Sequence, residues 1–176
     1  MPFVALNPDG ERICSLDHDD LRLEYRPGDF TCQLCGGEMV YKHGTQVRSH
    51  FAHKTACTSD YEHKPESREH RDAKYKIRDL LMTKYPGAKV DLEVPLPEIR
   101  RIADVHMDLN GWREVFEVQL SSITVEQIEA RTQDYESLNI TAQWWIGGAA
   151  DTPAIKQWCI EQFGEFNSIE VYASAA

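Results

Sequence analysis

The stretch REVFEVQLS, Arg113 to Ser121, decides the fold, because it reads as a β-strand that is covered on both of its faces. Its valines, phenylalanine and leucine favour β structure, and a run this apolar usually lies inside a sheet. Glu117 and Gln119 interrupt the run, and side chains two residues apart leave the same face of a strand. A buried carboxylate without a partner costs several kcal/mol. We therefore expect a metal ion, a cationic side chain or exposure at a strand end to offset the charge of Glu117.

The segments around this strand predict one α/β unit. Asn110-Gly111 predicts a hairpin turn before it, and Thr124 with Gln127 three residues later predicts a capped helix after it. In chain order we expect a helix over about 65–85, strands over about 89–94, 101–107 and 114–120, a helix over 125–138, a strand over 141–146, a helix over 153–163 and a strand near 169–172. The order αβββαβ, with a right-handed crossover around the second helix, predicts an α/β fold with a central mixed β-sheet flanked by helices.

The N-terminal part of the chain is more irregular. It reads as a short strand in FVALN, a turn at Pro8-Asp9-Gly10 and an acidic segment, LDHDDLRLEY, that we expect to form a helix of weak periodicity. A segment rich in cysteine and histidine follows. We therefore expect two domains, a small zinc-binding module over residues 1–62 and an α/β domain over residues 63–176.

The string CQLCGGEMVYKHGTQVRSHFAHKTAC has the spacing of a zinc site. Cys32 and Cys35 are separated by two residues and followed by two glycines, so the backbone can turn tightly around a metal. Tetrahedral zinc needs four ligands, and two more come from His50, His53 and Cys57. A CxxC pair also occurs in thioredoxin-like redox proteins, but no βαβ pattern surrounds this one.

Which two residues complete the zinc site stays open. His53 and Cys57 are four residues apart and would share one face of a helical turn, whereas His50 and His53 would do so across a short bend. No open coordination position or general base is apparent in this segment. We therefore expect a structural metal that holds together residues too polar to form their own core.

A set of polar side chains on two neighbouring strands predicts a second metal site. Asp104 lies in RRIADVHM, and the hairpin turn folds this strand against the one that carries Glu117 and Gln119. An Asp and a Glu on adjacent strands can share Mg²⁺ or Mn²⁺, which prefer carboxylate, carbonyl and water oxygens. Gln119 would orient the attacking water through its amide or add its carbonyl to the metal shell. The alternative is that both acids merely lie at strand ends.

The first predicted helix, ESREHRDAKYKIRDLL, adds to this set. Glu66, His70 and Lys74 follow one another at intervals of four residues, and Glu69 lies beside them. A first-turn glutamate, Glu66 or Glu69, would join the metal shell through a water molecule. Lys74 would supply the positive charge that Gln119 lacks. Ordinary pairing of side chains four residues apart on a helix explains the same spacing.

Composition excludes several classes of protein. The 176 residues are 41% hydrophobic and 27% charged, as in globular proteins. No apolar run reaches the roughly 18–20 residues of a membrane span, and the N-terminus MPFVALNPDGER lacks the basic and apolar regions of a signal peptide. We expect a cytoplasmic protein without a membrane partner. In a reducing compartment, five cysteines that include a CxxC pair favour metal or redox chemistry over a structural disulfide.

The net charge of −10, taken alone, argues against a nucleic-acid partner, because phosphate binding depends on Lys and Arg. The distribution of charge changes that conclusion. Residues 41–78 hold nine Lys or Arg against five acidic residues, whereas residues 103–176 hold three against twelve. The basic strip would guide a phosphate backbone, although a solvated helix face beside a loop explains the same charges.

These motifs occur in a recognisable order: CxxCGG, HFAH followed by a cysteine, ESxEHxxxK, RxADV, EVQLS, an RTxxY element and a WWIGG strand. The progression runs from about Phe3 to Gly148 and resembles the competence protein CoiA-like family. That family has a zinc-finger-like N-terminal part and a nuclease domain of the PD-(D/E)xK type, and it is associated with handling DNA during natural transformation. The combination is far more specific than any single motif.

The resemblance implies a restriction-endonuclease-like core that acts on DNA, single- or double-stranded. Asp104 and Glu117 would hold Mg²⁺ or Mn²⁺, with a helix glutamate, Glu66 or Glu69, nearby. Gln119 stands where the wider nuclease signature has lysine, and the CoiA-like group looks like one that has glutamine there. The residues expected at the DNA are His70, Arg71, Arg131 and Tyr135.

Two functions follow from these expectations. The first is a Mg²⁺- or Mn²⁺-dependent DNA nuclease of DNA processing or recombination, in which Lys74 and Gln119 position the nucleophile. The second is a catalytically weak or inactive module that binds DNA or a recombination or defence protein, which the acidic composition favours. For Arg131 and Tyr135, a structural packing pair is an open alternative to a place at the active-site rim. A third hypothesis, a zinc-ribbon interaction protein, leaves the polar groups of the second half unexplained.

Overall fold

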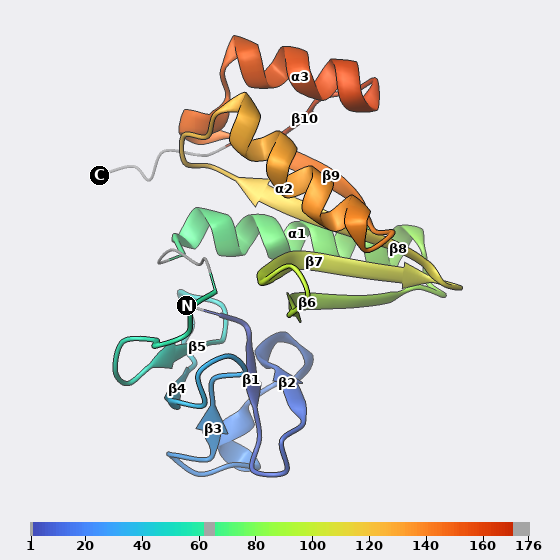
Figure 1. Cartoon of the computed structure of the whole chain (residues 1–176). Coiled ribbons are helices and arrows are strands. Elements are labelled where there is room, and N and C mark those ends of the chain that lie inside the picture. Colours follow the sequence, from blue (N-terminus) through green and yellow to red (C-terminus); the bar gives the residue numbers. More distant parts are fainter. Residues whose placement is uncertain (1, 62–65, 171–176) are drawn as a thin grey trace. The chain divides into compact units, whose positions relative to one another are not determined.

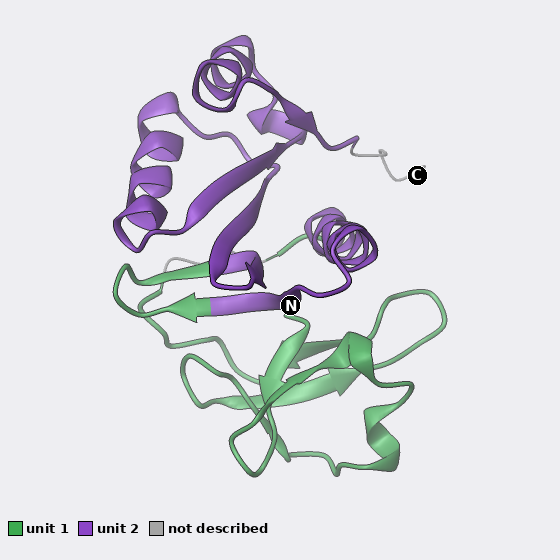
Figure 2. Cartoon of the chain, turned by 90° about the vertical axis from the view of Figure 1, so that its right-hand side faces the viewer, with its two compact units in different colours: residues 1–67, 95–102 green, residues 68–94, 103–176 purple. Residues whose placement is uncertain are grey.

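The computed structural model describes residues 2–61 and 66–170. The chain divides into two compact units, one of residues 1–67 and 95–102 and one of residues 68–94 and 103–176 (Figure 2). The expected domain boundary, between residues 62 and 63, falls outside the described residues. The segment 95–102, which the sequence assigns to the α/β domain, groups with the first unit.

The second unit is built on a mixed β-sheet. Its described strands are β6 (Lys89–Leu96), β7 (Arg101–Leu109), β8 (Trp112–Gln119), β9 (Thr141–Ile146) and β10 (Asn167–Ser168), and its helices are α1 (Arg68–Lys84), α2 (Val125–Ser137) and α3 (Pro153–Phe163). The strand order is β10-β9-β8-β7-β6 (Figure 1). β7 and β8 are antiparallel, whereas β8 and β9 are parallel and α2 connects them. The predicted α/β fold with a central mixed sheet flanked by helices is confirmed.

Helices cover both faces of this sheet. α1 lies on one face, and α2 lies on the other (Figures 1 and 2). Because successive side chains of a strand point to opposite faces, β9 sends Trp144 and Trp145 to different helices. Trp144 is 2% exposed and lies in one cluster with Ile128 of α2 and Trp158 of α3. Trp145 lines a groove beside Ile77 of α1.

The helices form where the sequence carries their local signals. In α1, Ala73, Ile77 and Leu81 are buried, and their spacing of four residues makes one apolar face. In α2, Thr124 and Gln127 form the predicted capping box. Among the described residues, no helix combines the length and the apolar composition that crossing a membrane requires.

The first unit holds a second sheet, in which neighbouring strands are antiparallel. Its described strands are β1 (Val4–Leu6), β2 (Arg12–Cys14), β3 (Phe30–Thr31), β4 (Glu38–Lys42) and β5 (His50–His53), in the order β2-β1-β3-β4-β5. Leu21, Phe30, Met39 and Phe51 form its small apolar core. A core of this size gains from a metal that cross-links its loops.

The acidic segment near residues 16–25 does not form the predicted helix. It folds as two short 3₁₀ helices, η1 (Ser15–Asp17) and η2 (Leu21–Leu23). Asp20 accepts a hydrogen bond from the Arg22 amide, one of the local bonds by which Asp competes with regular helix. Leu21 is buried but Leu23 is 85% exposed, so a continuous helix would gain little from packing.

Other boundaries differ by a few residues from those expected. α1 begins at Arg68 rather than near residue 65, which lies outside the described residues, and β6 extends to Leu96. β10 covers Asn167–Ser168, ahead of the strand expected at 169–172. Residues 171 and 172 of that strand lie outside the described part of the chain.

Candidate functional site

The first candidate site is a cluster of three cysteines and one histidine in the first unit. Cys32, Cys35, His53 and Cys57 each offer one ligand atom, and these atoms lie within 4.8 Å of one another. The Cys35 Sγ is 3.7 Å from the His53 Nε2. Three sulfurs and one imidazole nitrogen at such distances form a donor set suited to a tetrahedral metal. Of the two pairings left open by the sequence, the structure brings His53 and Cys57 to the CxxC pair.

His50, the remaining candidate ligand, lies outside this cluster. It is buried, and its Nδ1 is 2.8 Å from the carbonyl oxygen of Arg48. Both His50 and His53 belong to β5, and residues three apart in a strand point to opposite faces. The short bend that would let both histidines reach one metal is absent, because this described segment is a strand.

The backbone around the CxxC pair turns toward the sulfurs. The Leu34 amide donates to the Cys32 Sγ and the Gly37 amide donates to the Cys35 Sγ, each at 3.4 Å. Gly36 has a φ of 69°, in the left-handed region that favours glycine. A Cβ at Gly37 would lie 3.2 Å from the Cys35 Sγ, so the second glycine allows the close approach.

The two thiols of this pair have different acidities. Burial raises the pKa of Cys32 to about 11. For Cys35, burial acts in the same direction, but hydrogen bonds from the Gly37 and Thr58 amides and from His53 outweigh it and lower the pKa to about 6. Because the thiolate is the form that binds a metal, Cys35 is ready for metal binding near neutral pH.

The second candidate site lies in the second unit, where β7 and β8 separate. The ladder between the two strands ends at Val105 and Phe116. One residue further, hydrogen bonds from backbone amides to carboxylates take the place of the backbone pairing. The Asp104 amide donates to the Glu117 Oε1 at 3.1 Å, and the Val118 amide donates to the Asp104 Oδ2 at 2.9 Å. β8 continues beside β9 beyond this point. The two acids therefore mark a fork between the strands.

On the side of α2, Glu117 is enclosed by donors. It is 1% exposed, and its Oε1 accepts from the Tyr135 hydroxyl at 2.9 Å. Its Oε2 accepts from Arg131 at 2.8 Å, and Arg131 also donates to the Gln119 Oε1 at 3.0 Å. The Gln119 side-chain nitrogen donates to the Ser121 carbonyl at 2.7 Å. The sequence left three ways to offset the Glu117 charge: a metal ion, a cationic side chain or exposure at a strand end. The described residues show the second, because Arg131 pairs with Glu117.

Tyr135 is an internal residue, whereas Arg131 is partly buried. Tyr135 is 0% exposed, and the Arg131 guanidinium lies 4.8 Å from the centre of the Trp144 ring. Both residues contact Glu117, and the choice between a packing pair and a place at the active-site rim stays open. A direct contact of either residue with DNA stays a prediction.

On the side of α1, Asp104 lies closer to solvent. The His70 Nε2 is 3.0 Å from the Asp104 Oδ2, and the two side chains are 26% and 16% exposed. One helical turn later, the Lys74 Nζ is 2.7 Å from the Glu93 Oε1, and these side chains are 2% and 6% exposed. Asp104 and Glu117 thus approach the fork from the sides of different helices, Asp104 at its open part and Glu117 at its enclosed part.

The environments of the two acids push their pKa values apart. Burial would raise the pKa of Asp104, but the His70 ring and the Lys74 charge outweigh it and lower the pKa to about 2. Burial, and then the charge of Asp104, raise the pKa of Glu117. Burial beside Glu117 also raises the pKa of Tyr135, which therefore stays a hydrogen-bond donor. Two carboxyl groups with divergent pKa values can take different roles in proton chemistry.

Glu93 is the member of this site that sequence reasoning missed. In KVDLEVPL, Asp91 and Glu93 alternate with apolar residues, the pattern of a strand whose polar face meets solvent. The structure instead buries Leu92 and Glu93 in succession. A φ of 54° at Glu93 breaks the alternation of side chains between the two faces of the sheet, and no local sequence signal predicts that conformation.

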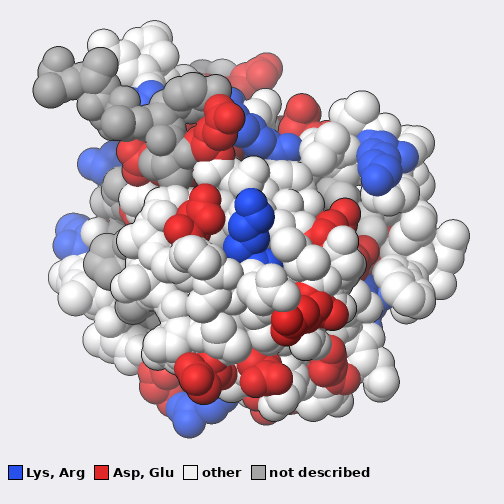
Figure 3. Space-filling model, turned by 90° about the horizontal axis from the view of Figure 1, so that it is seen from above, with Lys and Arg blue, Asp and Glu red and all other residues white. Residues whose placement is uncertain are grey.

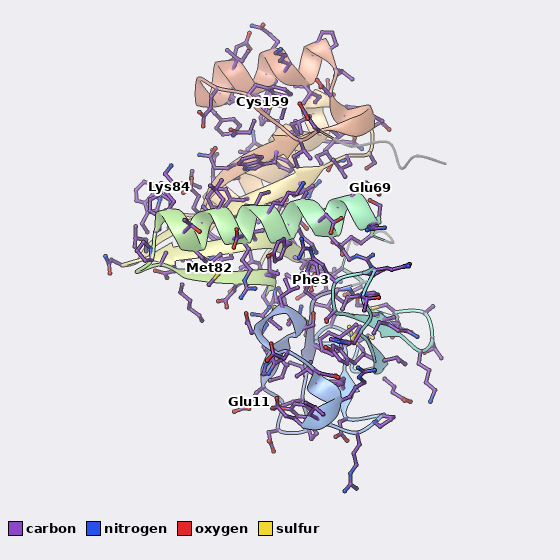
Figure 4. The ribbon with its side chains drawn as sticks, turned by 180° about the vertical axis from the view of Figure 1, so that it is seen from behind. Phe3, Glu11, Glu69, Met82, Lys84 and Cys159 are labelled. Atoms are coloured by element: carbon purple, nitrogen blue, oxygen red, sulfur yellow. The ribbon has the colours of Figure 1, made fainter. Side chains whose placement is uncertain are left out.

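The other predicted residues lie near the start of α1. Glu69 is in the first turn, and Figure 4 shows it at the N-terminal end of the helix, with Lys84 at the opposite end. Glu66 precedes the helix and belongs to the first unit. Arg71 is 5% exposed, so its side chain is not presented to solvent. The roles of Glu66 and Glu69 at the metal and of Arg71 at DNA stay predictions.

The oxygen donors at the fork fit a hard divalent cation. Carboxylates and amide carbonyls are the ligands that Mg²⁺ and Mn²⁺ prefer, and Asp104, Glu117 and Gln119 provide them. Asp104 is ionised and partly exposed. The Glu117 carboxylate already has a cationic partner in Arg131. A divalent cation is therefore best accommodated on the Asp104 side of the fork.

Comparison with protein-family models gives two matches. Residues 66–171 match the model described as "Competence protein CoiA, nuclease-like domain", and residues 14–60 match the model described as "Competence protein CoiA, N-terminal domain". The second match contains the cluster of Cys32, Cys35, His53 and Cys57. The first contains both acids of the fork.

Individual proteins give matches as well. The competence protein CoiA of Bacillus subtilis (strain 168) is 32% identical over 120 residues, which are 67% of this chain and 31% of that protein. The chain thus spans less than a third of the length of this relative. Among solved structures, a repair endonuclease from Pyrococcus abyssi aligns with a TM-score of 0.38 and 18% identity, over 95% of this chain and 76% of that one.

Proposed function

The chain belongs to the competence protein CoiA family, whose nuclease-like domain model matches residues 66–171, and on that premise we propose that it is a Mg²⁺- or Mn²⁺-dependent DNA nuclease. The observation that carries the proposal is the Asp104 carboxyl group, held at the open part of the fork between His70 and the Val118 amide. A carboxylate that stays charged at neutral pH and reaches solvent is suited to hold a cation beside a phosphate.

In the proposed reaction, a water oxygen bonds to phosphorus and the bond from phosphorus to the leaving sugar oxygen breaks. The attacking water loses one proton, and the leaving oxygen gains one. A divalent cation, when bound, supplies Lewis-acid chemistry, because it offsets the phosphate charge and makes water more acidic. Asp104, with Glu117 beside it, would hold that cation at the fork. The His70 Nε2 hydrogen-bonds the Asp104 carboxylate and would orient it, and the proton of the attacking water passes to the surrounding solvent.

Gln119 takes a supporting part in this proposal. Its carbonyl oxygen accepts from Arg131 and its amide nitrogen donates to Ser121, so it keeps Arg131 directed at Glu117. A neutral amide cannot replace the positive charge of the lysine that the wider nuclease signature has at this position. Another cation must then face the charge that develops on the phosphate.

For the first unit, the proposal is a structural Zn²⁺ held by Cys32, Cys35, His53 and Cys57. Four donors within 4.8 Å of one another, with amide hydrogen bonds to two of the sulfurs, support it. The four ligands are all protein side chains, which leaves no position for a reacting water. This metal would stabilise a unit with a small apolar core.

The second candidate function is a binding module without nuclease activity, and two observations favour it. Arg131 already neutralises Glu117, as a residue that replaces a metal would. Figure 3 views the molecule from above and shows acidic side chains with fewer basic ones on that face, in keeping with three Lys or Arg against twelve acidic residues over 103–176. Such a surface repels DNA unless the basic segment 41–78 or a protein partner compensates.

Incubation of the purified protein with plasmid and single-stranded DNA separates the two functions. The nuclease proposal expects cleavage with Mn²⁺ or Mg²⁺ that stops on chelation and in Asp104→Asn. Asp108→Asn, the same change on the same strand at the hairpin turn, is the matched control and should cleave normally. DNA binding without cleavage under any metal would instead support the binding module, and cleavage that persists in Asp104→Asn would contradict the site.

A further inference from the structure

Glu93 holds an unusual position in β6. Strand side chains normally alternate between the two faces of a sheet, yet Leu92 and Glu93 are both buried, at 2% and 5% exposure. The change of direction coincides with the φ of 54° at Glu93, which lies in the left-handed region that a residue with a long side chain rarely adopts. Such a conformation is strained and tends to occur where a side chain must be redirected.

The redirected carboxylate meets Lys74. Their Oε1 and Nζ atoms are 2.7 Å apart, and both side chains are nearly free of solvent contact. A buried ion pair usually contributes no more stability than apolar residues of similar volume. Stability therefore does not explain why this strand combines a strained backbone with a buried charge.

Lys74 lies on the same side of α1 as a residue of the candidate site. His70 lies one helical turn before it on α1 and contacts Asp104. The ammonium group is near enough to Asp104 that its charge contributes to the low pKa of that carboxyl. The charged groups near Lys74 thus include Glu93 from β6, in direct contact, and Asp104 from β7. The other cation at the fork, Arg131, is directed at Glu117 and Gln119.

We propose that Glu93 is a positioning residue that fixes the Lys74 ammonium group on the α1 side of the fork, so that this buried charge offsets, from within the protein, the charge that develops on a scissile phosphate at Asp104. This inference rests on the proposed nuclease function and deepens it. Lys74 thereby supplies, from the helix, the positive charge that Gln119 lacks on β8. Glu93 itself does not touch the substrate and acts through Lys74 alone.

The first test is the kinetics of Glu93→Gln, which keeps the shape of the side chain but removes its charge. We expect kcat to fall about 10- to 100-fold, as when a supporting group is removed from a functional residue, with KM for DNA unchanged. The falling limb of the rate at high pH, where Lys74 loses its proton, should move to lower pH, because an opposite charge no longer favours the ammonium form. If Glu93→Gln only disturbed the structure, the cleavage rate would fall by the same factor at every pH.

Two further variants keep this test selective. Asp91→Asn removes a carboxylate from the same strand, where it pairs with the exposed Lys89, and should leave kcat and the pH profile unchanged. Lys74→Arg keeps the positive charge and should retain more activity than Lys74→Met. A wild-type pH profile and kcat in Glu93→Gln, in a protein whose cleavage depends on Asp104, would overturn the inference and leave the nuclease proposal intact.

A second measurement does not depend on cleavage. In protein with ¹³C-labelled lysine, the Lys74 side-chain signal is identified by its loss in Lys74→Arg. Its titration should move to lower pH in Glu93→Gln and stay in place in Asp91→Asn. An unchanged titration in Glu93→Gln would overturn the positioning of Lys74 by Glu93. Absence of cleavage in the wild type, with a shifted titration in Glu93→Gln, would overturn the proposed function and the phosphate role of Lys74 but not that positioning.

Discussion

Arg131 donates to the Glu117 Oε2 at 2.8 Å, although the two are 14 positions apart in the chain and lie on different elements, α2 and β8. The buried carboxylate of Glu117 is thereby paired with a protein cation. A divalent metal at the fork must either leave this pair intact and bind mainly through Asp104, or displace the guanidinium. The pairing also makes Glu117 important for stability as well as for any chemistry.

Replacing Glu117 by glutamine should destabilise the second unit. The change leaves Arg131 without its counter-charge in a site where Glu117 is 1% exposed. Removal of one partner of a buried pair costs about 3–5 kcal/mol, and we expect the lower end because the Arg131 side chain is 26% exposed. Urea denaturation measures the loss. Glu114→Gln, on the same strand, is the control and should change the free energy of unfolding little.

The two acids of the fork should affect stability with opposite dependence on pH. The folded-state pKa of Asp104, about 2, is below its ordinary value of 3.8, so its ionisation stabilises the fold above that value. This contribution, on the order of 2 kcal/mol, should disappear as pH falls from about 4 to 2, and Asp104→Asn should lack it.

For Glu117 the folded-state pKa is raised above 4.5, so the contribution is present below that value and is lost as pH rises through the folded-state pKa. Unfolding free energies of wild type, Asp104→Asn and Glu117→Gln between pH 2 and pH 8 check both signs. Parallel curves for all three proteins would contradict the assigned shifts.

Gln119→Lys, which introduces the lysine of the wider nuclease signature, should destabilise the protein rather than activate it. The new ammonium would face the Arg131 guanidinium, to which the Gln119 carbonyl now accepts at 3.0 Å. Lost hydrogen bonds and like-charge repulsion predict a cost of about 1–3 kcal/mol. Thermal unfolding and cleavage assays measure both effects. Gln143→Lys, which alters a half-buried glutamine on β9, is the matched control, and a faster nuclease would refute the expectation.

Removal of the zinc ion proposed for the cluster of three cysteines and His53 should unfold the first unit. We expect one equivalent of zinc in the purified protein and a loss of β signal in circular dichroism when a chelator removes it. Cys57→Ser should lower the zinc content, because its sulfur belongs to the cluster. His50→Gln should retain zinc, since the His50 ring bonds to the Arg48 carbonyl instead. Loss of zinc in His50→Gln would show that the ligand set is different.

Much of the fold follows from local signals in the chain. The strand at Thr141–Ile146 and the helix at Pro153–Phe163 have the limits expected from their apolar pattern and flanking residues. The capping box of Thr124 and Gln127 likewise starts α2 where the sequence predicts it. Such signals act within a few residues, so they can be read without knowing the fold. The acidic segment before Tyr25 misled the prediction because its helical periodicity was weak and its local side-chain bonds favoured turns.

The two candidate sites could be predicted from the sequence only in part. Spacing along the chain was enough to identify the CxxC pair and to bring Asp104 toward Glu117, because a hairpin makes neighbours of its two strands. Spacing could not reveal that Arg131 pairs with Glu117 or that Glu93 turns inward to Lys74. It also could not choose His53 over His50 as the zinc ligand. Those outcomes depend on distances between side chains of separate elements and on one backbone angle, and both are set when the sheet, its twist and its covering helices come together.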